Sequence, residues 1–164
     1  MPDTSDGFVK ELVDKMAALG LMLATAESCT GGMIAAAMTD IAGSSEVFER
    51  GFVTYSNKAK EEMLGVPEET LFKHGAVSPH TAMAMVRGAI ANSHAEIAVS
   101  VTGIAGPGGG SEDKPVGLVY IGCGMKGGIV ESFEHRFQGD RDEIRLQTVA
   151  AALTHVAELV ETLA

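Results

Sequence analysis

The sequence predicts a three-layer α/β/α sandwich with a mixed, mostly parallel sheet. Helical and strand-like patterns alternate along the chain, one strand is a near-continuous apolar run, and two further strands stand close enough to form a hairpin. With 164 residues and 46% hydrophobic content, the chain fits one domain over residues 1–164 with a substantial core. The sequence shows no internal repeat, linker or domain boundary.

The chain begins with a helix, a strand and a second helix. Residues 6–19 carry apolar side chains at helical spacing, and Gly20 is a natural stop. The run LMLATA (21–26) is typical of a buried strand, and GGMIAAAMTDIAG (31–43) is typical of a short helix whose alanines permit close packing on a sheet. A second strand is expected over 51–56.

Two helices and the central strand follow. A short helix over 57–65 is expected to be capped by Asn57, and a longer helix over 77–94 has Pro79 in its first turn. The run AEIAVSVTG (95–103) predicts a central strand that is covered on both faces. A glycine-rich loop comes directly after it.

The C-terminal part combines a hairpin with a long helix. GLVYIGCGM and GIVESFEHRF are separated only by Lys126 and Gly127, which indicates a hairpin. The last helix runs from about Asp140 to Leu163 and keeps its apolar residues at a spacing of three and four. This apolar stripe could serve the chain's own core or a subunit contact, so the sequence is also compatible with a homo-oligomer.

Charge and composition exclude several classes of function. The net charge is −10 and no stripe of Lys and Arg could neutralise a row of phosphates, so nucleic acid is not an expected partner. The acidic N-terminus differs from a signal peptide, and no stretch approaches the roughly 18 apolar residues of a membrane span. We therefore expect no membrane association and a cytoplasmic location. The two cysteines and five histidines lack ligand spacing, so neither a metal nor a cofactor is predicted.

The segment TAESCTGG (25–32) contains the first candidate site. Ser28 and Cys29 fall at the carboxyl end of a predicted strand, where open α/β sheets bind their ligands. The glycines at 31 and 32 would let a substrate oxygen approach a helix N-terminus, where backbone amides could form an oxyanion hole. A tight turn with a capping serine is the competing interpretation. The candidate binding residues of this segment are Cys29, Thr30, Gly31 and Gly32.

A serine nucleophile needs a base, and no histidine stands in a recognisable triad pattern. In NKAKEEML, Lys60 lies between Met63 and Leu64 on the apolar side of the predicted helix. Burial and the positive end of the helix dipole would both lower the pKa of Lys60 from about 10.4, which would make it a base at neutral pH. The alternative is a snorkelling side chain with its ammonium in water.

A second candidate site follows the central strand, at what should be the same sheet edge as Ser28. The Thr102 hydroxyl and the amides after it could bind a phosphate or carboxylate, whereas the rest of the loop is expected to be ordinary surface. Arg141, at the start of the last helix, could pair with a phosphate or with neighbouring acids. The loop residues retained as a site are Thr102, Gly103, Ile104, Ala105 and Gly106.

The motifs TAESCTGG, DIAGSSEVFERGFVTYSNKAK, LGV, HGAVS, SVTGIAGPGGGSEDKPVG and GDRD occur in this order. From about Val9 to Leu159 the chain thereby resembles the CinA C-terminal family, the nicotinamide-nucleotide amidohydrolases. The resemblance implies a three-layer α/β/α fold and hydrolysis of the carboxamide of nicotinamide mononucleotide to nicotinate mononucleotide and ammonia. It also implies a metal-free mechanism with Ser28 as nucleophile and Lys60 as base. Many family members carry an additional N-terminal domain, and we expect this chain to be a stand-alone version.

The resulting hypothesis is that neutral Lys60 takes the proton of Ser28, which attacks the carboxamide carbon. Tyr55 would relay protons or contact the ring, and Glu27 would orient Lys60. One rival makes Cys29 the nucleophile, since a helix N-terminus lowers the pKa of a thiol. Another rival is a non-catalytic nucleotide-binding or interaction module, which would need Lys60 to stay charged.

Overall fold

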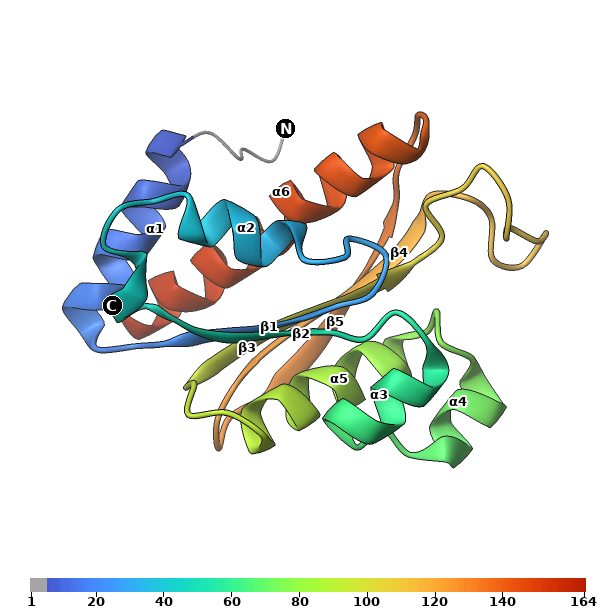
Figure 1. The fold of residues 1–164 in the computed structure, drawn as a ribbon, viewed down its shortest axis with the longest axis horizontal. Coiled ribbons are helices and arrows are strands. Elements are labelled where there is room, and N and C mark those ends of the chain that lie inside the picture. Colours follow the sequence, from blue (N-terminus) through green and yellow to red (C-terminus); the bar gives the residue numbers. More distant parts are fainter. Residues whose placement is uncertain (1–5) are drawn as a thin grey trace.

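The computed structural model describes residues 6–164, and a five-stranded sheet with helices on both faces forms its centre (Figure 1). Strand β1 pairs in parallel with β2 and β3, whereas β4 pairs antiparallel with β3 and β5. Four strands therefore run in one direction and β4 runs in the other, which confirms the mixed, mostly parallel sheet. The strand order is β2 (Phe48–Val53), β1 (Leu23–Glu27), β3 (Ile97–Gly103), β4 (Leu118–Met125) and β5 (Val130–Arg136).

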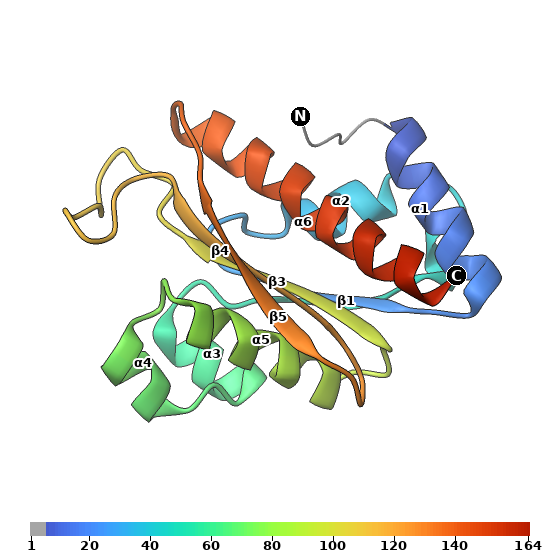
Figure 2. The same cartoon turned by 180° about the vertical axis from the view of Figure 1, so that it is seen from behind.

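The helices form the two outer layers (Figures 1 and 2). One face of the sheet is covered by α1 (Asp6–Leu19), α2 (Met33–Thr39) and α6 (Arg141–Leu163). The other face is covered by α3 (Asn57–Leu64), α4 (Glu68–His74) and α5 (Pro79–Ala91), and a short 3-10 helix, η1 (Ser44–Glu46), leads into β2. The three-layer prediction is therefore confirmed.

The order of the strands determines where a site can form. Helix α2 connects β1 to β2 on one face, and α3 to α5 connect β2 to β3 on the other. After β1 the chain forms β2 on one side of β1 and then β3 on the opposite side. The carboxyl ends of β1 and β3 are therefore the topological switch point of the sheet. Ser28 follows β1 directly, and Thr102 lies at the end of β3.

Alternation along the strands divides the core between the two helical layers. Leu23 belongs to the cluster under α1, α2 and α6, whereas its neighbour Ala24 belongs to the cluster under α5. Small residues bring α5 close to the sheet: a Cβ added to Gly122 would lie only 2.7 Å from the carbonyl oxygen of Ala82. The tight packing of α5 leaves little freedom for the helices beside it.

Several predicted boundaries were wrong. Strand β2 begins three residues earlier than the predicted 51–56, and it ends at Val53 because β1, its partner, ends at Glu27. Ser56, rather than Asn57, caps α3, since its Oγ accepts a hydrogen bond from the amide of Ala59 at 3.0 Å.

Helix α4 was not predicted, although Pro67 and two glutamates at its start are typical of a helix N-terminus. The final helix agrees with its prediction, because Asp140 and Glu143 form a reciprocal capping box. Residues 1–5, the beginning of the acidic N-terminal segment, lie outside the described part of the chain.

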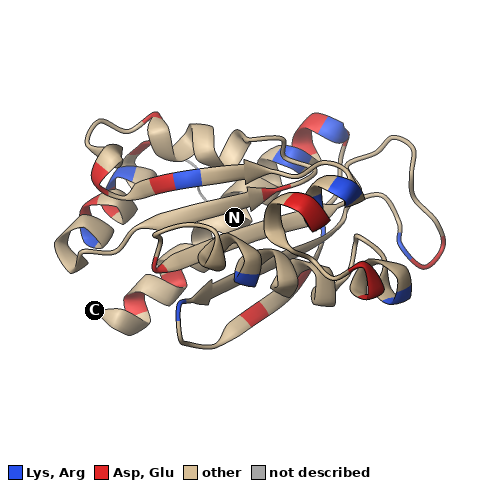
Figure 3. Ribbon diagram, turned by 60° about the horizontal axis from the view of Figure 1, so that its bottom comes forward, with Lys and Arg blue, Asp and Glu red and all other residues tan. Residues whose placement is uncertain are grey.

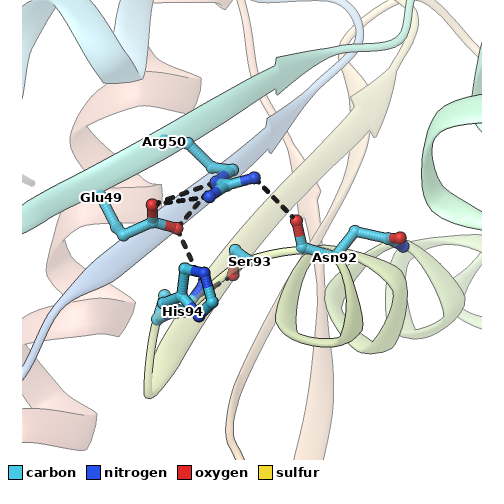
Figure 4. Close-up of polar contacts among 6 residues, drawn as sticks. Glu49, Arg50, Asn92, Ser93 and His94 are labelled. Atoms are coloured by element: carbon cyan, nitrogen blue, oxygen red, sulfur yellow. Dashed lines mark hydrogen bonds and ion pairs between the residues drawn. The ribbon is translucent and has the colours of Figure 1, made fainter.

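Polar contacts fasten the edge strand β2 to the loop after α5 (Figure 4). Glu49 accepts hydrogen bonds from Arg50 and from the amide of His94, and Arg50 donates to the carbonyl of Asn92 at 3.2 Å. The hydrogen bond from Arg50 lowers the pKa of the Glu49 carboxyl group. These contacts tie the start of β2 to the loop that leads into β3, away from the carboxyl ends of the strands.

Charged residues of both signs are interspersed over the helices and loops (Figure 3). None of the helices in residues 6–164 is long and apolar enough to span a membrane.

Candidate active site

A cavity of about 220 Å³ opens at the switch point, where the segments after β1, β2 and β3 meet. It contains side chains from both candidate segments and from the start of α6. The residues that line it are Ser28, Cys29, Tyr55, Asn57, Lys60, Ala76, Val77, Thr102, Gly103, Ala105 and Arg141.

Ser28 and Lys60 are in direct contact in this cavity. The amide of Ser28 donates to the carbonyl of Val101 on β3 at 3.1 Å, which fixes the start of the turn. Lys60 Nζ lies 3.1 Å from Ser28 Oγ, 3.0 Å from the carbonyl oxygen of Thr54 and 3.4 Å from that of Tyr55. The two carbonyls accept only, so they take two N–H bonds of the amine. The remaining position of the nitrogen faces the serine hydroxyl.

Burial favours the neutral form of Lys60. The side chain is 1% exposed, and it makes no ion pair with any described residue. Burial lowers the pKa of Lys60, and its place in the first turn and a half of α3 adds the opposition of the helix dipole. Lys60 points inward, as the periodicity predicted, and the snorkelling alternative is wrong.

Cys29 has the opposite environment to that of an activated thiol. It is 6% exposed, and burial raises the pKa of the Cys29 thiol to about 11. The expectation of a lowered pKa was wrong because the apolar surroundings outweigh any effect of the nearby helix. At neutral pH this thiol stays protonated.

The N-terminus of α2 is already occupied by Glu27. The Glu27 carboxylate accepts hydrogen bonds from Thr30 Oγ1 at 2.6 Å and from the amides of Ile34 and Ala35 at 2.9 and 3.1 Å. Two predictions were therefore wrong: Glu27 does not orient Lys60, and the first turn of α2 is not free to receive a substrate oxygen. A buried carboxylate at the strand end satisfies those amides instead.

Gly31 and Gly32 allow the backbone conformation of the turn and do not line the cavity. Gly31 and Gly32 have backbone φ angles of 58° and 110°, which residues with a Cβ rarely adopt. Neither glycine lines the cavity, and Thr30 is buried away from it. Of the amides assigned to an oxyanion hole, that of Cys29 lies beside Ser28; no backbone carbonyl within residues 6–164 accepts a hydrogen bond from it, and its one contact is with its own thiol.

Arg141 and Tyr55 meet at the rim of the cavity. Arg141 Nη2 donates to the Tyr55 hydroxyl at 3.3 Å, and Nη1 donates to the carbonyl of Gly106 at 2.6 Å. The pairing of Arg141 with neighbouring acids is not observed within residues 6–164. Tyr55 is 64% exposed, and its hydroxyl bonds to Arg141 rather than to Lys60. Its position suits contact with a ligand better than transfer of a proton.

The loop after β3 contributes only part of its predicted site. Thr102, Gly103 and Ala105 line the cavity, and Thr102 Oγ1 donates to the carbonyl of Ala76 at 2.8 Å. Ile104 and Gly106 do not line it: the amide of Ile104 pairs with Leu118, and the Gly106 carbonyl accepts from Arg141. The backbone groups of these two positions therefore hold the base of the loop in place.

Comparison with known proteins identifies the family. Residues 6–160 match the model of the family described as the CinA C-terminal domain. The chain belongs to the CinA C-terminal domain family.

Similar CinA-family proteins include enzymes and much longer chains. "Nicotinamide-nucleotide amidohydrolase PncC" of Escherichia coli (strain K12) is 54% identical over 83% of this chain and 82% of its own length. A "Putative competence-damage inducible protein" of Caldicellulosiruptor bescii is 61% identical over 81% of this chain, which spans only 32% of that relative. The crystal structure of the competence/damage inducible protein CihA of Agrobacterium tumefaciens superimposes with a TM-score of 0.93 at 52% identity, covering 97% of both chains.

Sequence reasoning missed several residues of this CinA-type site. Asn57, which the sequence predicts only as a cap, is the first residue of α3 and lines the cavity together with Ala76 and Val77. Arg145 was also missed: it donates to the carbonyls of Cys29 and Thr30 at 3.0 and 3.3 Å. Its position four residues after Arg141 was an available signal, because both then lie on one face of the helix. Among the described residues, no three His, Cys, Asp or Glu side chains are arranged to hold a metal ion.

Proposed function

We propose that this chain hydrolyses the carboxamide of nicotinamide mononucleotide to nicotinate mononucleotide and ammonia, a reaction of pyridine nucleotide salvage. The observation that carries the proposal is the buried Lys60 amine, 3.1 Å from Ser28 Oγ and without an acidic partner among the described residues. Relatives more than half identical to this chain are named for this activity, which supports the same substrate.

The reaction begins with transfer of the Ser28 proton to the lone pair of neutral Lys60, while Ser28 Oγ forms a bond to the carboxamide carbon. The carbonyls of Thr54 and Tyr55 then stabilise the new ammonium by accepting two of its hydrogen bonds. The oxygen of the tetrahedral intermediate accepts a hydrogen bond from the Cys29 amide. The ammonium donates a proton to the amide nitrogen, the C–N bond breaks, and ammonia leaves an ester on Ser28.

Water completes the cycle by hydrolysing the ester, with Lys60 again as the base and Ser28 now as the leaving group. Lys60 accepts a proton from a water molecule, and the resulting hydroxide attacks the ester carbon. The C–O bond to Ser28 breaks, Ser28 recovers its proton from Lys60, and the acid that forms loses its own proton to solvent water and leaves as a carboxylate. These steps need no metal, because Lys60, Ser28, the leaving amine and solvent water account for every proton.

Cavity size and charge support a nucleotide as the substrate. A volume of about 220 Å³ is below the roughly 300–1,000 Å³ that encloses a whole drug-sized ligand, so only part of the ligand is buried. The pyridine carboxamide would fill the cavity at Ser28, and the ribose phosphate would extend to the rim. There the guanidinium of Arg141, which has no acidic partner among the described residues, would bind the phosphate beside Tyr55.

The proposal is tested by ammonia release from nicotinamide mononucleotide, nicotinamide riboside and nicotinamide. We expect turnover with a strong preference for the phosphorylated compound, loss of turnover in Ser28→Ala, and retention of turnover in the matched control Cys29→Ala. Ammonia release by Ser28→Ala at the wild-type rate would contradict the assignment of the nucleophile. Tight binding of the mononucleotide without turnover would instead support the non-catalytic binding module.

A further inference from the structure

A second cavity, of about 570 Å³, lies among α3, α4 and α5 on the other helical layer from α6. It shares no lining residue with the cavity at Ser28. Its volume falls within the roughly 300–1,000 Å³ typical of small-molecule sites. Leu64, Met83 and Ala84 supply an apolar wall, which would accept the body of a small organic molecule.

The polar groups of this cavity favour an anion. No described residue in its lining is acidic, although the chain has 22 acidic and 12 basic residues. Arg87 projects from α5 and makes no ion pair with any described residue, whereas Arg50 and Arg136 both pair with glutamates. The residues three and four positions from Arg87 along α5 are all uncharged, so its own helix supplies no partner.

Two histidines extend this donor-rich lining. The rings of His74, at the end of α4, and His80, at the start of α5, stack with their centroids 3.6 Å apart and an interplanar angle of 10°. Imidazole, guanidinium and the nearby Thr70 hydroxyl are all groups that donate hydrogen bonds to phosphate or carboxylate oxygens. The cavity therefore combines an apolar wall with donors suited to an anionic group.

The wall of this cavity also belongs to the helix that holds Lys60. A Cβ added to Gly88 of α5 would lie 1.9 Å from the carbonyl oxygen of Leu64, so the two helix backbones are in direct contact. Beyond Leu64, the amide of Val66 donates to the carbonyl of Lys60 itself at 3.2 Å. The last turn of α3 therefore connects the wall of this cavity to the backbone of Lys60.

We propose that the cavity among α3, α4 and α5 binds a small organic anion, a phosphate or carboxylate on an apolar body, and that its occupancy acts on Lys60 through the last turn of α3. The anionic group lies on Arg87, and the apolar body contacts Met83 and Leu64. The binding step is independent of the proposed amidohydrolase activity. Only the resulting change in turnover rests on the proposed function.

Binding is tested by titrating the isotope-labelled chain with phenyl phosphate, benzoate and phenol while recording its amide resonances. We expect saturable shifts of the amide resonances of residues 64–70 and 83–91. Shifts with phenyl phosphate alone would identify a phosphate ligand, shifts with benzoate alone a carboxylate ligand, and shifts with both a site that accepts either group. Phenol, which lacks the strong anionic group, should bind roughly tenfold more weakly or worse. Shifts confined to residues 28–32 and 102–105 would overturn the proposal, because they would place the anion in the cavity at Ser28.

Arg87→Gln is the decisive variant, with Arg136→Gln as the matched control, because both remove one exposed arginine and Arg136 lies on β5, outside the lining of the cavity. The first should weaken anion binding by roughly tenfold or more, and the second should leave it unchanged. Equal affinity of wild type and Arg87→Gln would overturn the site. At saturation the side-chain resonances of Lys60 should also move, and an unmoved Lys60 would refute the coupling. None of these measurements depends on turnover, so they fail or succeed separately from the ammonia-release assay.

Discussion

Lys60→Met should change how the stability of the fold depends on pH. In the folded chain, burial lowers the pKa of Lys60, whereas in the unfolded chain this lysine titrates near its ordinary value of about 10.4. Between the two pKa values the unfolded state binds one proton more than the folded state, so stability rises with pH. The penalty for charging Lys60 is fully present below the folded pKa and disappears above the unfolded pKa.

The size of this effect follows from a single proton. One proton bound only by the unfolded state gives a slope of about 1.4 kcal/mol per pH unit in the free energy of unfolding. Methionine has a similar length and no charge, so it removes the slope. It leaves the carbonyls of Thr54 and Tyr55 without the amine, but that cost does not vary with pH.

The assay is chemical denaturation of wild type and Lys60→Met from about pH 6 to about pH 11, with the free energies subtracted at each pH. All other titrating groups cancel in the difference. Lys58→Met is the control, because it removes an exposed lysine from the same helix. A difference between wild type and Lys60→Met that is flat across this range would refute the argument that burial lowers the pKa of Lys60.

Three further predictions concern the residues around Lys60. Cys29 should react slowly with iodoacetamide at neutral pH and faster as the pH approaches the Cys29 pKa of about 11. Rapid modification of the native chain at neutral pH would show that burial does not protect the thiol. Arg141→Gln should raise KM for nicotinamide mononucleotide by roughly tenfold or more and leave KM for nicotinamide riboside nearly unchanged. An equal rise of KM for both substrates would mean that Arg141 does not bind the phosphate. Gly88→Ala should destabilise the fold by about 1–3 kcal/mol and lower kcat, because its Cβ would lie 1.9 Å from the Leu64 carbonyl. Gly108→Ala, where no atom lies within 4 Å of the added Cβ, is the control, and equal stability of the two variants would contradict the contact between α5 and α3.

The parts of the site that depend on local pattern could be predicted from the sequence. The apolar run before Ser28 predicted a strand end, and the alternation of strands and helices predicted which segments meet at that edge. The helical periodicity of NKAKEEML was enough to predict that Lys60 points inward. Each of these inferences uses the spacing of neighbouring residues, which the folded chain preserves.

The wrong predictions concern side chains whose environment depends on residues distant in the sequence, or for which two neighbouring residues could fill the same role. Glu27 is close to Ser28 in sequence, yet it faces α2, because its side chain bonds the free amides of that helix. Cys29 was expected to have a lowered pKa, but its burial depends on long-range packing that a local motif does not contain. Ser56 and Asn57 are both good capping residues, and spacing alone could not decide between them.

The central claim is that Ser28 attacks the substrate with Lys60 as its base. It is tested most directly by quenching the enzyme in acid during turnover of nicotinamide mononucleotide and mapping the covalent adduct by mass spectrometry. We predict a nicotinate mononucleotide ester on the peptide that contains Ser28, and no ester in Ser28→Ala or Lys60→Met. An adduct on Cys29 or on any other residue, or undiminished ammonia release by Ser28→Ala, would contradict the account.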